Sequence, residues 1–76
     1  MIIKVLGTGC AKCKQQERAV IKAIERSGAD AAVEKVTEIN DIMDYGVMMT
    51  PSLVIDEKVV SMGKVLSVDD IEKLIK

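Results

Sequence analysis

The chain has 76 residues, of which 49% are apolar and one is aromatic, and its formal net charge is -1. This length suits one domain with one core, and no stretch reads as a linker, so we expect a single domain over residues 1–76. Interleaved charges and the lack of stacking aromatics argue against nucleic acid as a partner. The apolar run Met1 to Leu6 is broken by Lys4 and is too short for a signal sequence or a membrane span. We therefore expect a cytoplasmic protein that does not bind membranes.

The first half of the chain predicts a strand, a helix and a second strand. Ile2–Leu6 is apolar enough for a buried strand, and Gly7-Thr8-Gly9 allows a sharp turn after it. From about residue 13 to residue 27, apolar residues recur on one helical face, and Gly28 follows as a stop signal. Ala32–Val36 contains β-branched residues and predicts a strand, which the helical crossover places parallel to the first.

The second half predicts a short helix, a hairpin and a last helix. Glu38 to Tyr45 has a short helical pattern. Ser52–Ile55 and Lys58–Met62 flank Asp56-Glu57 as the strands of an antiparallel hairpin. Ser67 to Asp70 resembles a capping box before a helix with an apolar face at Ile71, Leu74 and Ile75. The order is βαβαββα, which predicts an α/β fold with a four-stranded mixed sheet in the order 2-1-3-4, flanked by helices.

Two cysteines with the spacing Cys10-Ala11-Lys12-Cys13 are the residues most suited to chemistry. A permanent disulfide is unusual in a reducing compartment, so we expect the pair to react. A thiol attacks a disulfide only as the thiolate. Cys10 stands just before a predicted helix, whose N-terminal N–H groups favour an anion, and Lys12 and Lys14 add positive charge. Cys13 falls in the first helical turn, where we expect it to be less exposed and to resolve the mixed disulfide formed by Cys10.

Three segments in this order resemble the thioredoxin and glutaredoxin superfamily, most closely its very small archaeal and bacterial redox-active disulfide proteins. The segments are residues 7–13, Thr50-Pro51 before the third strand, and Gly63 after the fourth. The resemblance implies a thioredoxin-like fold in which Thr50-Pro51 forms a cis peptide bond facing the cysteines. It also implies a substrate site formed by Gly9, Ala11, Lys12, Thr50, Pro51 and Gly63.

The resemblance implies a protein-disulfide oxidoreductase with Cys10 as the nucleophile and Cys13 as the resolving thiol. No cofactor is expected beyond the redox-active Cys10–Cys13 disulfide. The expected partners are protein disulfides and an unidentified reductase, and we expect a monomer.

The chain departs from ordinary thioredoxins at two positions. Gly9 stands where they have tryptophan, and Lys4 stands where they keep a buried acid that accepts the proton of the resolving thiol. Glu17, Glu34 or water are the alternatives for that proton. We hypothesise that Lys4 lies beneath the cysteines, pairs with Glu34 and lowers the pKa of Cys10.

Two other functions remain open at this stage. Small heavy-metal chaperones carry Met-x-Cys-x-x-Cys after their first strand, and soft thiolates select Cu(I) or Zn. Thr8 replaces that methionine here, and the chain ends in a predicted helix instead of a strand. The other alternative is a thioredoxin-like interaction module without catalytic activity. Met48 and Met49 are expected to fill the core in part.

Overall fold

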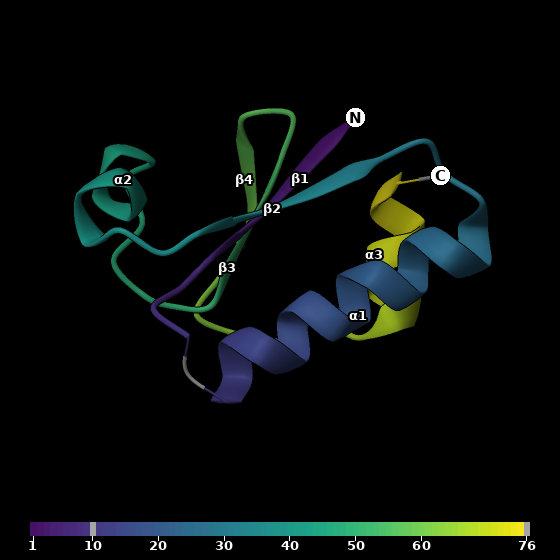
Figure 1. Cartoon of the computed structure of the whole chain (residues 1–76), viewed down its shortest axis with the longest axis horizontal. Coiled ribbons are helices and arrows are strands. Elements are labelled where there is room, and N and C mark those ends of the chain that lie inside the picture. Colours follow the sequence, from purple (N-terminus) through teal and green to yellow (C-terminus); the bar gives the residue numbers. More distant parts are fainter. Residues whose placement is uncertain (10, 76) are drawn as a thin grey trace.

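The computed structural model describes residues 1–9 and 11–75, and it contains the expected alternation of strands and helices (Figure 1). In chain order the elements are β1 (Ile2–Leu6), α1 (Ala11–Ser27), β2 (Ala32–Val36), α2 (Ile39–Asp44), β3 (Ser52–Ile55), β4 (Lys58–Met62) and α3 (Val68–Ile75). The predicted order βαβαββα and the bounds of all four strands are confirmed.

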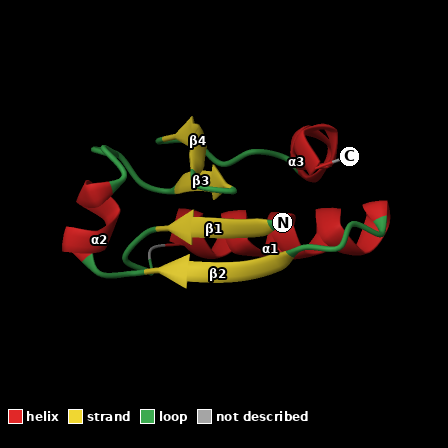
Figure 2. Ribbon diagram, turned by 90° about the horizontal axis from the view of Figure 1, so that it is seen from above, coloured by secondary structure: helices red, strands yellow, loops and turns green. Residues whose placement is uncertain are grey.

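The strands form a single sheet in the order β2-β1-β3-β4, as predicted. β1 is a central strand that pairs in parallel with β2 and antiparallel with β3, while β3 pairs antiparallel with β4. Figure 2 shows β1 and β2 side by side and pointing toward the end of the sheet where α2 lies. The turn that follows β1 therefore opens at this end of the molecule.

The larger core lies between the sheet and the pair α1 and α3. Alternate residues of a strand point to opposite faces, so Ile3 and Val5 of β1 point toward these helices. α1 and α3 are also joined by Arg26, which pairs with Asp69 at 3.3 Å and with Glu72 at 3.0 Å. The buried residues of this cluster are Ile3, Val5, Val20, Ala23, Leu53, Ile55, Ile71 and Ile75.

The opposite face of the sheet has a smaller core at one end. α2 covers only the end where β1 and β2 terminate (Figure 2), and the buried cluster there consists of Leu6, Ile42, Val47 and Val54. The remainder of this face opens into a pocket of about 640 Å³ whose lining includes Lys4, Asp41, Tyr45 and Glu57.

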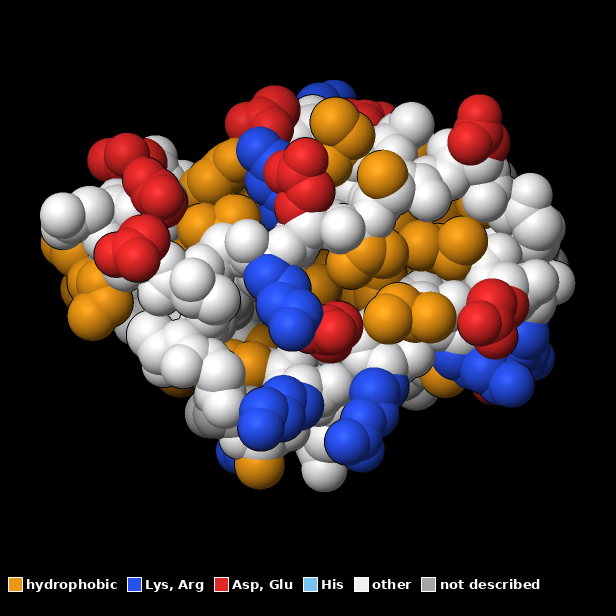
Figure 3. All heavy atoms as spheres, in the orientation of Figure 1, with side chains coloured by type: hydrophobic (Ala, Val, Ile, Leu, Met, Phe, Trp, Pro, Cys, Tyr) orange, Lys and Arg blue, Asp and Glu red, His pale blue; other side chains and the backbone are white. Residues whose placement is uncertain are grey.

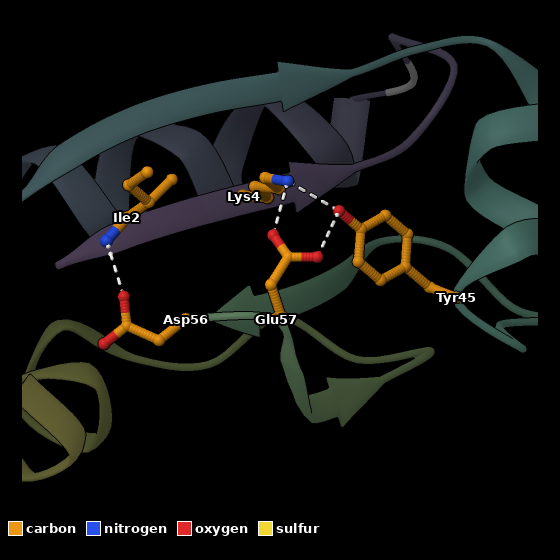
Figure 4. Close-up of polar contacts among 5 residues, drawn as sticks. All are labelled: Ile2, Lys4, Tyr45, Asp56 and Glu57. Atoms are coloured by element: carbon orange, nitrogen blue, oxygen red, sulfur yellow. Dashed lines mark hydrogen bonds and ion pairs between the residues drawn. The ribbon is translucent and has the colours of Figure 1, made fainter.

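The turn between β3 and β4 has two non-glycine residues in the left-handed region, where Asp56 has φ 48° and Glu57 has φ 69°. Such residues are disfavoured unless other contacts hold them. Here the Ile2 N–H donates to Asp56 Oδ1 at 2.9 Å, and the Asp56 N–H donates to the Ile2 carbonyl at 2.9 Å. Glu57 contacts Lys4 and Tyr45 (Figure 4). Contacts with β1 and the residue after α2 thus hold the turn.

Three expectations about burial were wrong. Met48 is 93% exposed and Met49 is 59% exposed, so neither fills the core, and Leu74 is 44% exposed. The methionines lie after Val47, whose burial ends the apolar packing of α2, and the chain then runs over the surface toward Thr50. α2 is also shorter than the predicted Glu38 to Tyr45, because its flanking residues adopt cap positions.

Candidate functional site

The site is built around the turn that leads from β1 into α1. Gly9 has φ +94°, a conformation that glycine adopts without steric cost, and α1 begins at Ala11. The first turn of α1 contains no acidic residue, and its Ala11 and Lys12 are exposed. The start of this helix therefore favours an anion placed before it. Cys10, the predicted nucleophile, lies outside the described residues.

Cys13 lies in the first turn of α1 and is buried, with 5% of its surface exposed. Its sulfur packs against the backbone of Gly7, so closely that a methyl group on Gly7 would overlap Cys13 Sγ. The same methyl group would lie 3.0 Å from Cys13 Cβ and 3.9 Å from Thr50 Cβ. Gly7 is therefore the point where the end of β1, the first turn of α1 and the segment before β3 converge.

Thr50 and Pro51 lead into β3 beside this convergence. Their peptide bond is cis, Thr50 is exposed and Pro51 is buried. The Gly63 N–H donates to the Pro51 carbonyl at 3.0 Å. Gly63 has φ +77°, and a methyl group there would lie 3.1 Å from Met49 Cβ. Thr50-Pro51 thus lies beside Gly7 of the first segment singled out in the sequence and is hydrogen-bonded to Gly63, so the structure brings the three segments together.

Gln16 is a residue of this region that the sequence analysis missed. Its side chain is completely buried one turn after Cys13. Its amide donates to the Leu66 carbonyl at 3.3 Å and accepts from the Leu66 N–H at 2.8 Å. Gln16 therefore ties the segment after Gly63 to α1. The available signal was a polar residue at a helical position that shares a face with Val20 and Ala23.

A small pocket of about 100 Å³ opens beside Cys13 on the α1 face of the sheet. It is bounded by α1, β1 and β2, and its lining residues are Val5, Gly7, Gly9, Cys13, Lys14, Glu17, Lys35 and Thr37. Within it, Lys35 Nζ lies 3.1 Å from Glu17 Oε2.

A larger, mostly apolar pocket of about 320 Å³ opens on the other side of the β1–α1 turn. Thr8 and Thr50 form one of its walls, and α2 with the segment after it forms the other, through Ile39, Ile42, Met43, Val47 and Met48. In Figure 3 apolar side chains reach the surface at this end of the molecule below a group of acidic ones, while basic side chains gather over α1. Thr50 is therefore bordered by an apolar surface.

Lys4 lies away from Cys13, contrary to the expectation that it sits beneath the cysteines. It alternates with Ile3 and Val5 on β1 and so points to the opposite face of the sheet from α1. Its Nζ lies 2.7 Å from Glu57 Oε1 and donates to the Tyr45 hydroxyl at 2.6 Å (Figure 4). The expected pair with Glu34 is wrong: the two residues are register partners, but the ammonium pairs with Glu57.

The contacts of Lys4 shift the ionisation of both members of the pair. The hydrogen bond to Glu57, followed by that to Tyr45, raises the pKa of Lys4 above its ordinary value. The hydrogen bond from Lys4 in turn lowers the pKa of Glu57. This geometry gives Lys4 a partner of its own on the α2 side of the sheet, and it argues against a role for Lys4 at the cysteines.

The sheet order, the flanking helices and a buried cysteine in the first turn of α1 define a thioredoxin-like α/β protein. A family model described as a thioredoxin domain matches residues 1–76. The chain is 41% identical to a thioredoxin of Methanocaldococcus jannaschii over all 76 residues, which cover 87% of that relative. It is 36% identical to a thioredoxin of Methanothermobacter thermautotrophicus over 75 residues, 99% of this chain and 97% of that relative. The chain therefore belongs to the thioredoxin family of thiol-disulfide oxidoreductases.

No helix among the described residues is both long enough and apolar enough to span a membrane. In the same part of the chain, no three or more histidine, cysteine, aspartate or glutamate side chains gather as a metal site would require.

Proposed function

We propose that the chain is a cytoplasmic protein-disulfide oxidoreductase that works through Cys10 and Cys13. The observation that supports this most is the burial of Cys13 against Gly7 in the first turn of a helix that begins directly after Cys10. A helix start of this kind lowers the pKa of an adjacent thiol. A cysteine one turn further on is close enough to displace a bound substrate.

In the proposed reaction, the Cys10 thiolate attacks one sulfur of a substrate disulfide. The second substrate sulfur leaves as a thiolate, and a mixed disulfide forms. Cys13 then attacks Cys10 Sγ, which releases the first substrate sulfur and leaves a Cys10–Cys13 disulfide. Two electrons pass from the chain to the substrate, and a cellular reductase returns them. No cofactor beyond this disulfide takes part, and the chain acts as a monomer.

We propose that the substrate binds to a surface formed by Gly9, Ala11, Lys12, Thr50, Pro51 and Gly63. Ala11, Lys12 and Thr50 are exposed around the β1–α1 turn, and Gly63 is hydrogen-bonded to the Pro51 carbonyl. The apolar pocket beside Thr50 is suited to the apolar side chains that flank a disulfide in a partly unfolded protein.

Trapping of the mixed disulfide tests the proposal. Cys13→Ser, incubated with disulfide-bonded insulin, is expected to accumulate a covalent adduct that a reducing agent releases, whereas Cys10→Ser is expected to form none. The same insulin reduction assay on the unmodified chain separates an oxidoreductase from an interaction module. Absence of reduction, together with stoichiometric binding of Cu(I) or Zn in a titration of the reduced chain, would instead support a thiolate metal carrier.

A further inference from the structure

The proposed function leaves open how Cys13 loses its proton, because only its thiolate can attack Cys10. We infer that Glu17 accepts this proton and that Lys35 holds the Glu17 carboxylate at the pocket beside Cys13. The inference rests on the proposed function and assigns a further residue to it.

The helix places Glu17 next to Cys13. Residues four positions apart share a helix face, with about 5 to 6 Å between their Cβ atoms. Both side chains line the pocket of about 100 Å³. Among the described residues that line this pocket, the charged ones are Lys14, Glu17 and Lys35. The carboxylate in the lining therefore comes from Glu17.

The ion pair with Lys35 limits where the Glu17 carboxylate can go. Lys35 is the register partner of Val5, and both line the pocket. Its ammonium lies 3.1 Å from Glu17 Oε2, which joins β2 to α1 across the pocket, and the Glu17 side chain is only 25% exposed. The pocket also has room for a water molecule, which needs about 10 to 15 Å³. The proton can therefore pass directly or through one water.

Glu34 was the other carboxylate considered for this role, and its position excludes it. It pairs in register with Lys4, whose side chain lies on the opposite face of the sheet from α1. Adjacent parallel strands present register partners to the same face. Glu34→Gln is therefore a matched control, since it makes the same chemical change on the far side of the sheet.

In the proposed step, the Cys13 S–H bond breaks and its proton passes to the Glu17 carboxylate. The Cys13 sulfur forms a bond with Cys10 Sγ while the bond between Cys10 and the substrate sulfur breaks. The electron pair of that bond leaves on the substrate sulfur as a thiolate. Glu17 then returns its proton to water.

Dithiobis(nitrobenzoate) in equimolar amount separates the two chemical steps in a stopped-flow experiment. Attack by Cys10 releases the first coloured thiolate, and resolution by Cys13 releases the second. The rates of both phases would be measured from mildly acidic to alkaline pH for the unmodified chain, Glu17→Gln, Glu17→Asp and Glu34→Gln.

Glu17→Gln is expected to slow the second release about a hundredfold at neutral pH and to leave the first unchanged, which is the lower end of what a general base typically contributes. The defect should shrink as the pH rises and the thiol ionises without help. Glu17→Asp should restore part of the rate, and Glu34→Gln should change neither phase. If Glu17 acted only through its negative charge, it would disfavour the Cys13 thiolate. Glu17→Gln would then speed the second release instead of slowing it.

Two further results have distinct meanings. Second-phase rates of Glu17→Gln that match the unmodified chain at every pH, or exceed them, would overturn the role of Glu17 and leave the proposed function standing. A lack of any first release from the unmodified chain would overturn the proposed function itself.

Discussion

Position 7 requires glycine because Cys13 Sγ occupies the space that a Cβ would need. Gly7→Ala is expected to destabilise the reduced chain by about 1 to 3 kcal/mol, the usual cost of overpacking. Urea unfolding would measure it. In a Cys13→Ala background the cost should fall, since the overlapping sulfur is gone. Strictly additive costs of the two substitutions would show that Gly7 and Cys13 do not interact.

Lys4 is separated from the cysteine site because it lies on the face of β1 that points away from α1. Because its ammonium lies with Glu57 and Tyr45 on the face away from α1, Lys4→Met is expected to leave the thiolate titration of Cys10 unchanged. Ultraviolet thiolate absorbance against pH, compared with that of the unmodified chain, checks this. A titration curve moved to higher pH would restore Lys4 as a residue that tunes the thiol.

Gln16 links the helix α1 to the segment before α3. Gln16→Leu keeps roughly the same volume but leaves the Leu66 N–H and carbonyl without this partner, so a loss of about 1 to 3 kcal/mol in stability is expected. Hydrogen exchange at the Leu66 amide should accelerate. Gln15→Leu, at an exposed neighbouring position, is the control and should stay within about 0.5 kcal/mol. Equal losses of stability for the two substitutions would show that the hydrogen bonds between Gln16 and Leu66 do not stabilise the chain.

The elements themselves could be predicted because each has a local signal. Ser67 shows this for α3: its hydroxyl accepts from the Asp70 N–H at 3.2 Å, as the capping box indicated. What the sequence could not show depends on residues far apart in the chain. The pairing of Lys4 with Glu57 follows from the register of β1 against β3 and from the turn conformation. The exposure of Met48 follows from the course of the chain after the buried Val47, where it runs over the surface toward Thr50.

The candidate site could be predicted where it depends on local helix geometry, but not where it depends on contacts between distant segments. Burial of Cys13 follows from helix geometry alone and is confirmed. The helical period also places Glu17 beside Cys13, but the choice between Glu17 and Glu34 required knowing which face each strand residue takes. The role of Gln16 required knowing that the segment around Leu66 returns to α1.

The cluster of Lys4, Tyr45 and Glu57 joins three distant parts of the chain: β1, the residue after α2 and the β3–β4 turn. Glu57→Gln is expected to lower the melting temperature at neutral pH. The pKa of Glu57 is lowered in the folded chain, so its contribution exists above the ordinary glutamate pKa and is lost as the pH falls through the lowered value.

The difference in melting temperature between Glu57→Gln and the unmodified chain should therefore shrink toward zero in acid. On the alkaline side the contribution of Lys4 is fully present below the ordinary lysine pKa and is lost as the pH rises through its raised pKa. Glu25→Gln, at an exposed position of α1, is the control and should leave the melting temperature almost unchanged. A constant difference at all pH values would mean that the Glu57 charge is not what stabilises the cluster.

The sheet order also decides when this protein can fold during its own synthesis. β1 is translated first, yet it is a central strand whose second partner, β3, is among the last strands made. Until residues 52–55 have emerged, β1 has only β2 to pair with, and its other edge stays unpaired. Pairings between such distant segments form slowly and expose the chain to aggregation. A nascent chain stalled before β3 would therefore present this edge of β1 to the strands of other chains.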